Sequence, residues 1–271
     1  MGSASPTTLS DRLAQAFAAR RQAGGAALIP YITAGHPDYA ATAGFLAGAR
    51  DAGADVVELG IPWSDPVADG PVIQRSSHAA LRAGATLERT LACLASAGGG
   101  VPVVLFTYLN PVLARGPAAF ARDAANQGAD GLLVVDLPVG ADAGVEEALR
   151  AGGLPLVRLV APTTGAPRLR QIAAASEGFV YLIARTGVTG APSVLTADVR
   201  GRVEQVRAAS RLPVAIGFGI GSEQQARDAA ALADGVVVGS ALVERMEQGG
   251  ARAALDLVRR LRRAIDGAKA A

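Results

Sequence analysis

Three carboxylates stand close together in a segment that begins as an apolar strand and continues as a loop rich in proline and glycine. This segment, residues 56–71, reads VVELGIPWSDPVADGP. Glu58 belongs to the strand, whereas Asp65 and Asp69 belong to the loop. Burial disfavours the charged form of a carboxylate, so a carboxylate inside a strand carries a free-energy cost. That cost is typical of sites that move protons, and Glu58 is the first candidate for such chemistry.

Glu58 and Asp69 are too far apart in the chain for local geometry to bring them together. A loop that folds back over the strand would do so, with Glu58 held rigidly and Asp69 carried by the loop. The pair would then suit proton transfer. Two plainer interpretations stay open: Glu58 as a carboxylate paired with a basic side chain, and Asp69 as a turn residue before Gly70.

Short β-branched runs alternate with stretches of helical periodicity along the whole chain. Eight strands are predicted, at 27–32, 55–60, 101–108, 131–136, 156–160, 178–184, 213–217 and 235–239. Helices are predicted between them, at 38–52, 86–97, 117–127, 145–151, 168–175, 199–209, 223–231 and 241–264. An additional amphipathic helix, 9–22, precedes the first strand.

Eight strand–helix units in one chain of this length predict an α/β protein, a single (β/α)8 TIM barrel with an extra N-terminal helix. The alternative, an open doubly wound sheet, is weakened because no GxGxxG follows the first strand. Residues 9–271 are expected to form one catalytic domain, after a flexible tail at 1–8. Functional side chains of such barrels lie at the C-terminal strand ends. Five candidates should therefore face one mouth: Glu58, Asp69, Tyr108, Asn110 and Asp136.

Glycine-rich turns follow the last three strands, at 186–190, 217–221 and 239–240. Glycine lets backbone N–H groups approach an anion, and a helix N-terminus attracts it. These barrels often bind phosphate at this place, so we expect a phosphate site that includes Ser240. Ordinary turns and helix caps are the alternative reading. No Walker motif is present, which favours a small phosphorylated molecule over a nucleoside triphosphate.

Aromatic residues at or beside the strand ends could line an apolar pocket or belong to the core: Tyr31, Phe106, Tyr181 and Phe218. A metal site is not expected, because the only histidines, His36 and His78, show no ligand spacing. His36 precedes a proline and is predicted to be a solvated loop residue.

The composition argues against several classes of partner. The chain has 271 residues and a formal charge of only +2, so nucleic acid is not expected to bind. No apolar run reaches the length of a membrane span, and the first residues do not read as a secretory signal. Cys93 is the single cysteine, predicted to be buried, and it excludes an internal disulfide. A cytoplasmic protein is therefore expected.

Taken together, seven segments resemble the tryptophan synthase alpha chain family over almost the whole length. They are residues 30–35, 58–71, 108–111, 136–138, 161–164, 185–190 and 217–220. The resemblance implies a lyase that cleaves indole-3-glycerol phosphate to indole and glyceraldehyde 3-phosphate, a retro-aldol reaction without metal or organic cofactor. It also implies a beta chain as partner, in an alpha2beta2 complex, with pyridoxal phosphate only in that beta chain.

By the same resemblance, Glu58 is the general acid that protonates the indole carbon, and Asp69 accepts a hydrogen bond from the indole N–H. Thr189 matches the threonine that bonds this aspartate when the loops close. The resemblance implies that Tyr181 lies beside the catalytic carboxylate, that Gly190, Gly219, Gly239 and Ser240 bind the phosphate, and that Pro62, Asp65 and Asn110 face the beta chain. With the aromatic pocket, the predicted substrate contacts are Tyr181, Thr189, Phe218, Phe106 and Tyr31.

Two other functions stay open at this point. A different phosphate-binding barrel of neighbouring indole chemistry, an isomerase or synthase, would more often carry a lysine or cysteine at a strand end. Lys269 is the only lysine of this chain. A catalytically idle subunit that binds ligand and activates a partner would have no need for a costly strand carboxylate. The sequence also leaves open whether the chain cleaves its substrate alone or in a complex.

Overall fold

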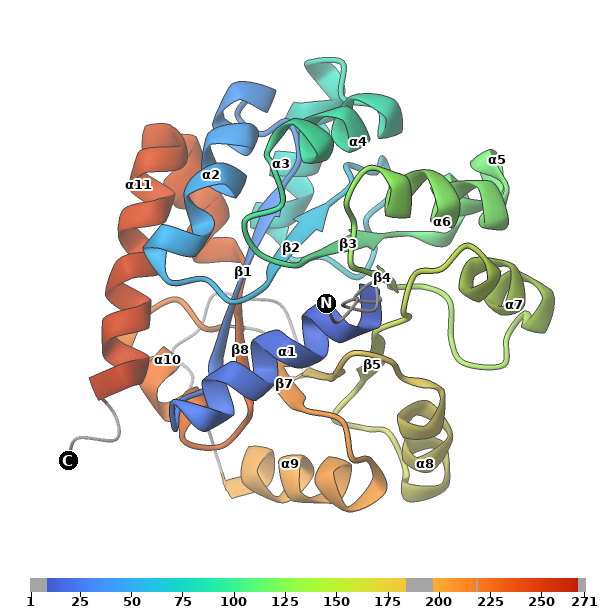
Figure 1. The fold of residues 1–271 in the computed structure, drawn as a ribbon, viewed down its shortest axis with the longest axis vertical. Coiled ribbons are helices and arrows are strands. Elements are labelled where there is room, and N and C mark those ends of the chain that lie inside the picture. The colour runs from blue at the N-terminus through green and yellow to red at the C-terminus, as the bar shows by residue number, and fades with distance from the viewer. Residues whose placement is uncertain (1–8, 184–196, 218, 268–271) are drawn as a thin grey trace, which may run out of the picture.

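The computed structural model describes residues 9–183, 197–217 and 219–267. Strands and helices alternate along them (Figure 1). The strands are β1 Ala27–Thr33, β2 Val57–Gly60, β3 Val103–Thr107, β4 Gly131–Val134, β5 Arg158–Val160, β6 Val180–Ile183, β7 Val214–Gly217 and β8 Gly235–Val238. The helices are α1 Leu9–Gln22, α2 Tyr39–Ala52, α3 Pro71–Arg82, α4 Leu87–Ser96, α5 Leu109–Arg115, α6 Pro117–Asn126, α7 Ala143–Ala151, α8 Ala166–Ala175, α9 Ala197–Ala209, α10 Glu223–Ala230 and α11 Ser240–Gly267.

All eight strands belong to one parallel sheet. Their order is β4-β3-β2-β1-β8-β7-β6-β5. An additional parallel bridge between Leu132 of β4 and Leu156, just before β5, joins the two ends of this order into a ring. The helices surround the strands on the outside (Figure 1). The predicted (β/α)8 barrel is therefore confirmed.

Two apolar layers hold the barrel together. The larger layer lies between the strands and the surrounding helices, and the smaller layer fills the inside of the barrel. Leu13 and Phe17 of α1 belong to the inner layer, where Phe17 meets Phe179 with ring centroids 5.3 Å apart. Because the strands are covered on both faces, nearly every strand residue is buried, as parallel barrels require.

A repeated hydrogen bond ties alternate strands to the loop that leads into the next strand. In each case a carboxylate before an even-numbered strand accepts the backbone N–H of a residue at, or just before, the start of the preceding strand. The four bonds are Leu28 N to Asp55 (2.8 Å), Val103 N to Asp130 (2.8 Å), Leu156 N to Glu177 (2.7 Å) and Val214 N to Asp234 (2.9 Å). These carboxylates accept backbone N–H groups that have no partner in the parallel sheet. They thereby hold the start of one strand against the loop that leads into the next.

We expect Asp130→Ala to lower the free energy of unfolding by about 2–3 kcal/mol, since it removes a charge-assisted bond to a buried N–H. Asp130 is fully buried and also pairs with Arg12 at 2.7 Å. Chemical denaturation would measure the change, with Asp51→Ala on the exposed face of α2 as control. The control should change stability by less than about 0.5 kcal/mol. Equal stability of the two variants would contradict this role for Asp130.

The structure corrects the predicted elements in three places. Helices α3 and α5 were not among the predicted helices. Strand β4 ends at Val134, before Asp136, and several strands are shorter than predicted. Helix α11 runs past the predicted end but is interrupted at Gly249 and Gly250, where Gly250 takes φ +62°. That conformation favours glycine, so the sequence itself marks the break.

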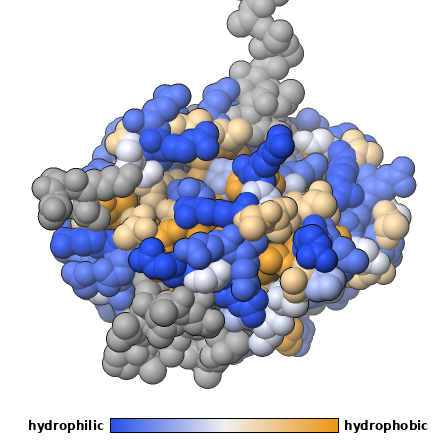
Figure 2. All heavy atoms as spheres, turned by 90° about the horizontal axis from the view of Figure 1, so that it is seen from below, coloured by the Kyte–Doolittle hydropathy of each residue, from blue (hydrophilic) through white to orange (hydrophobic). Residues whose placement is uncertain are grey.

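Hydrophilic side chains predominate on the face seen in Figure 2, with hydrophobic ones in small groups between them. Among the described residues, the large hydrophobic side chains that are exposed are Val67 (82%) and Leu113 (48%). No helix within the described ranges is long and apolar enough to cross a membrane.

Candidate active site

A cavity of about 260 Å³ opens at the C-terminal ends of the strands. Its wall combines three carboxylates, several aromatic and aliphatic side chains, and the glycine-rich turns after β7 and β8. The lining residues are Tyr31, Glu58, Asp69, Gly70, Ile73, Phe106, Tyr181, Gly219, Ile220, Gly221, Val237, Gly239, Ser240, Ala241 and Glu244. Residues from both halves of the chain therefore meet in one place, as the barrel predicts.

Glu58 lies inside β2, where the pairing with both neighbours fixes its position. It stands opposite Tyr31 of β1 and Val104 of β3. Its side chain is 1% exposed, and its Oε1 has no hydrogen-bond partner within the described part of the chain. Burial raises the pKa of Glu58 to about 8. At neutral pH this carboxyl therefore carries a proton that it can donate.

Asp69 comes from the loop between β2 and α3, residues 61–70, which we call loop two. Helix α3 holds this loop through its side chains: Gln74 Nε2 donates to Asp69 O at 2.9 Å, and Ser77 Oγ accepts from Trp63 N at 2.7 Å. Tyr108, at the end of β3, donates its hydroxyl to Asp69 Oδ2 at 3.1 Å. Loop two therefore folds back over the mouth, as the sequence predicts.

Burial raises the pKa of Asp69 to about 6, against the opposing effect of the Tyr108 hydrogen bond. Asp69 is therefore mainly ionised at neutral pH, whereas Glu58 is mainly protonated. Two carboxyl groups whose environments separate their pKa values can act as acid and as charge stabiliser at the same pH. The aromatic side of the cavity thus holds one proton donor, Glu58, and one fixed negative charge, Asp69.

Aromatic rings form the wall beside these carboxylates. Tyr31 and Phe106 meet edge to face, with centroids 5.3 Å apart. The tyrosine hydroxyls each lie against a glycine of the neighbouring strand. A Cβ placed on Gly60 would stand 2.1 Å from the Tyr31 oxygen, and one on Gly217 would stand 2.3 Å from the Tyr181 oxygen. Any larger residue at these two glycines would displace a ring from the wall of the cavity.

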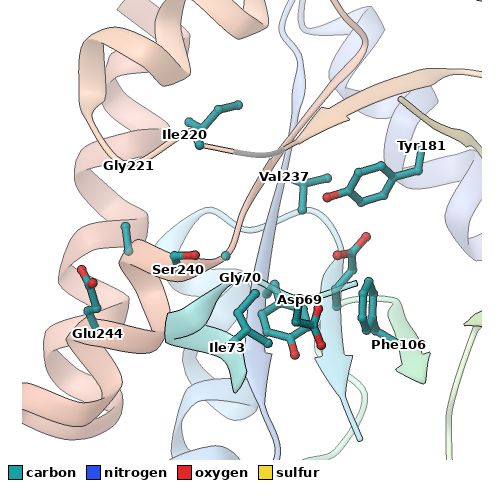
Figure 3. A pocket seen from close by; sticks show the side chains of 15 residues that line it. Asp69, Gly70, Ile73, Phe106, Tyr181, Ile220, Gly221, Val237, Ser240 and Glu244 are labelled. Carbon is teal, nitrogen blue, oxygen red and sulfur yellow. The ribbon is translucent and has the colours of Figure 1, made fainter. Parts of the chain in front are cut away.

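The opposite side of the cavity has few side-chain charges and several backbone amides. In Figure 3, Ser240 and Gly221 lie on this side, and Asp69, Phe106 and Tyr181 lie on the other. Ser240 is the first residue of α11, and the first N–H groups of a helix have no acceptor within it. This end suits an anion, and the aromatic side suits a flat apolar group. Glu244 also lines this end.

Most of the predicted site residues that the structure describes meet in the cavity. Glu58, Asp69, Tyr31, Phe106, Tyr181, Gly219, Gly239 and Ser240 all line it. Thr189, Gly190 and Phe218 lie outside the described residues, as do the glycine-rich turn 186–190 and the tail 1–8.

The candidates for partner contact lie elsewhere. Asp65 and Asn110 are exposed, whereas Pro62 is buried within this chain. Asp136 does not line the cavity; it is exposed, and its Oδ1 accepts Leu109 N at 2.6 Å at the start of α5. Its carboxylate thus caps that helix, a structural role.

The expectation that His36 is solvated was wrong. Its side chain is 7% exposed, because the turn after β1 folds back on itself: His36 N donates to Thr33 O at 3.2 Å. Gly35 N donates to Thr42 Oγ1 of α2 at 3.0 Å, which holds the turn against that helix. Burial lowers the pKa of His36.

The prediction that Cys93 is buried was confirmed.

Sequence reasoning missed part of the wall and the support of loop two. Ile73 and the loop anchors Gln74 and Ser77 lie on α3, which was not among the predicted helices. Pro71 at its first position, after Gly70, was the available signal. The contact of Tyr108 with Asp69 joins two loops and has no signal in sequence spacing.

Among the described residues, no group of histidine, cysteine, aspartate and glutamate could hold a metal ion.

Comparison with known proteins agrees with this geometry. The family model described as tryptophan synthase alpha chain matches residues 17–269. The tryptophan synthase alpha chain of Caulobacter vibrioides is 46% identical over 240 residues, 88% of this chain and 87% of the relative. That of Burkholderia multivorans is 44% identical over 264 residues, 95% of this chain and 97% of the relative.

Solved structures are similar as well. A chain of Mycobacterium tuberculosis tryptophan synthase gives a TM-score of 0.86 at 39% identity, covering 94% of this chain and 98% of that one. The tryptophan synthase alpha subunit of Legionella pneumophila gives a TM-score of 0.85 at 34% identity, with the same coverage.

Proposed function

This chain belongs to the tryptophan synthase alpha chain family, and on that premise we propose that Glu58 and Asp69 carry the family's reaction. The reaction is the cleavage of indole-3-glycerol phosphate to indole and glyceraldehyde 3-phosphate. It is a carbon–carbon lyase step in tryptophan biosynthesis, and the alpha subunit performs it without a cofactor.

Glu58 starts the reaction as general acid. Its proton goes to the indole ring carbon that bears the glycerol phosphate chain, and the ring nitrogen becomes positively charged. Ionised Asp69 accepts the N–H of that ring and stabilises the growing charge. The bond between ring carbon and side chain then breaks, its electron pair returns to the ring, and the adjacent hydroxyl becomes the aldehyde as it loses its proton. The Glu58 carboxylate can accept that proton, which restores the acid.

Two ends of the cavity orient the substrate for this step. The aromatic wall of Tyr31, Phe106 and Tyr181 suits the flat indole ring. The amides at Gly219 and Gly239 and the start of α11 at Ser240 suit the phosphate. We assign Thr189, Gly190 and Phe218 to the same pocket on the family resemblance alone.

The partner is the tryptophan synthase beta chain, in an alpha2beta2 complex, and pyridoxal phosphate belongs to that beta chain. We propose that its contact surface includes exposed Asp65 and Asn110, with buried Pro62 shaping loop two behind them. Support comes from Val67 and Leu113, the large exposed hydrophobic residues of the described chain, which lie on the same two segments. Exposed apolar side chains are typical of surfaces that a partner covers.

The observation that carries the assignment of roles is the different setting of the two carboxyls: Glu58 is buried with an unpartnered Oε1, whereas Asp69 accepts the Tyr108 hydroxyl. It makes a prediction for the pH profile of kcat/KM for indole release. Activity should fall below about pH 6, as Asp69 gains a proton, and above about pH 8, as Glu58 loses one. A profile that stays flat from pH 5 to pH 9 would contradict the two roles.

Product analysis tests the reaction itself. Purified chain incubated with indole-3-glycerol phosphate should release indole and glyceraldehyde 3-phosphate in equal amounts. Ring closure or sugar isomerisation of a related substrate, without free indole, would favour the isomerase or synthase alternative. Binding without cleavage, even with the beta chain added, would favour an idle subunit.

We also propose that residues 9–271 act as one catalytic domain and that the protein works in the cytoplasm. The eight strands in a single sheet support the first statement, and the single cysteine supports the second. A chain that starts at residue 9 should cleave at the rate of the full chain. Fractionation of cells that express the tagged chain would test its location.

A further inference from the structure

The hydroxyl of Tyr108 makes two hydrogen bonds that meet at loop two. It donates to Asp69 Oδ2 at 3.1 Å and accepts Ala68 N at 3.1 Å. An ionised carboxylate can only accept, so the single phenol proton goes to Asp69 and a lone pair of the phenol oxygen accepts the Ala68 N–H. Tyr108 thereby engages the side chain of Asp69 and the backbone beside it with a single oxygen atom.

Tyr108 itself is held firmly. It is 2% exposed and stands between β3 and α5. Asp136 fixes the start of α5 through Leu109 N at 2.6 Å. Tyr108 is not among the residues that line the cavity, so any effect on the reaction must pass through Asp69.

We propose that Tyr108 is a positioning residue, which holds Asp69 by one oxygen and leaves the other for the indole N–H. This inference rests on the proposed function of Asp69. A hydrogen bond donated to a carboxylate favours its charged form, so the same contact favours the ionised form of the half-buried Asp69. If Asp69 were rotated or protonated, it would form a weaker hydrogen bond with the indole N–H and would stabilise the positive charge of the ring less.

Other ionisable groups among the described residues also interact with Asp69 or Tyr108, and none of these carries a positive charge. Those that interact electrostatically with Asp69 or Tyr108 are Tyr31 on β1, Tyr181 on β6 and Asp136 after β4; Glu58 on β2 lines the same cavity. All of them are neutral or negative near pH 7. The hydroxyl of Tyr108 is therefore the contact that lowers the pKa of Asp69 against the effect of burial.

The test is Tyr108→Phe, which keeps the ring and removes the oxygen. Ala68 is exposed, so water can accept its N–H, and the ring keeps its packing, so the variant should fold. We expect the acidic limb of the kcat/KM profile to move to higher pH by about one pH unit, the effect of losing a hydrogen bond to a charged group. At pH 7, kcat/KM should fall by about tenfold. Tyr39→Phe, which removes a hydroxyl bonded to Thr90 Oγ1 on the outer helices, should leave the profile unchanged.

A loss of activity with an unmoved acidic limb would assign Tyr108 a structural role and overturn the proposal, as would an unchanged Tyr108→Phe variant. If Tyr108→Phe does not fold, the pH profile of kcat/KM is measured for Tyr108→Trp and Tyr108→His instead. The acidic limb should stay at the wild-type pH only in a variant whose ring N–H donates to Asp69. A second comparison uses Asp69→Asn: adding Tyr108→Phe to it should lower kcat/KM no further, and a further fall would also overturn the proposal. Wild-type chain that releases no indole would instead refute the proposed function, so the two failures are distinguishable.

Discussion

Glu58→Gln should lower kcat for indole release by at least about 10³-fold while the substrate still binds, because the amide has no acidic proton to give to the ring carbon. Glutamine has nearly the same shape, and Glu58 lies in the middle of an apolar strand pairing with β1 and β3. The wall of the cavity therefore keeps its form. The loss should fall on kcat and leave affinity for a non-cleavable indole alkyl phosphate within about threefold.

Stopped assays of indole release, with calorimetric titration of the analogue, would measure both quantities. Glu147→Gln on the exposed face of α7 is the matched control and should turn over normally. A near wild-type kcat in Glu58→Gln would contradict the assignment of Glu58 as the general acid.

The same variant carries a prediction for stability. The pKa of Glu58 is raised from 4.5 to about 8 by burial, so the folded chain binds this proton more tightly than the unfolded chain. Stability from this group is thus full at low pH and is lost as pH rises between about 4.5 and 8. Glutamine does not titrate, so Glu58→Gln should not lose this stability as pH rises. Its melting temperature at pH 8 should be no lower than that of the wild type, as is common when an active-site charge is neutralised.

Asp69→Asn should lower kcat by about 10²- to 10³-fold, the cost of removing a preorganised charge from a site where charge develops. The amide oxygen can still accept the indole N–H, but it carries no net charge to stabilise the protonated ring. Substrate affinity should change little, because the phosphate and the aromatic contacts lie elsewhere in the cavity.

Steady-state kinetics at pH 7 would show the effect, with Asp51→Asn as the control of equal chemistry on the surface. The acidic limb of the pH profile should also disappear in Asp69→Asn, since the group that titrates there is gone. A variant that keeps both its rate and its acidic limb would assign Asp69 to the loop structure alone.

The sequence was sufficient to bring the central residues together, because a barrel has one face for the ends of all its strands. That rule placed Glu58 and Asp69 at one mouth, where both line the cavity, but it also placed Tyr108, Asn110 and Asp136 there, and these do not line it. The fold could be predicted because helical periodicity and β-branched runs alternate along the whole chain, which indicates eight strand–helix units.

Contacts between distant loops were beyond the sequence. The bond of Tyr108 to Asp69 depends on how far loop two folds back, which no spacing encodes. The burial of His36 depends on a turn that packs against α2, so a histidine before a proline gave the wrong expectation. Gly60 was predicted only as the last residue of a strand, and no spacing shows that it must leave room for the Tyr31 ring.

The most direct test of the whole account is the release of indole from indole-3-glycerol phosphate by purified chain, measured alone and with the beta chain. We expect slow release by the chain alone and faster release when the beta chain covers loop two and α5. Fast release that the beta chain leaves unchanged would contradict the proposed contact surface. No release in either mixture would contradict the central claim that this barrel is a working lyase.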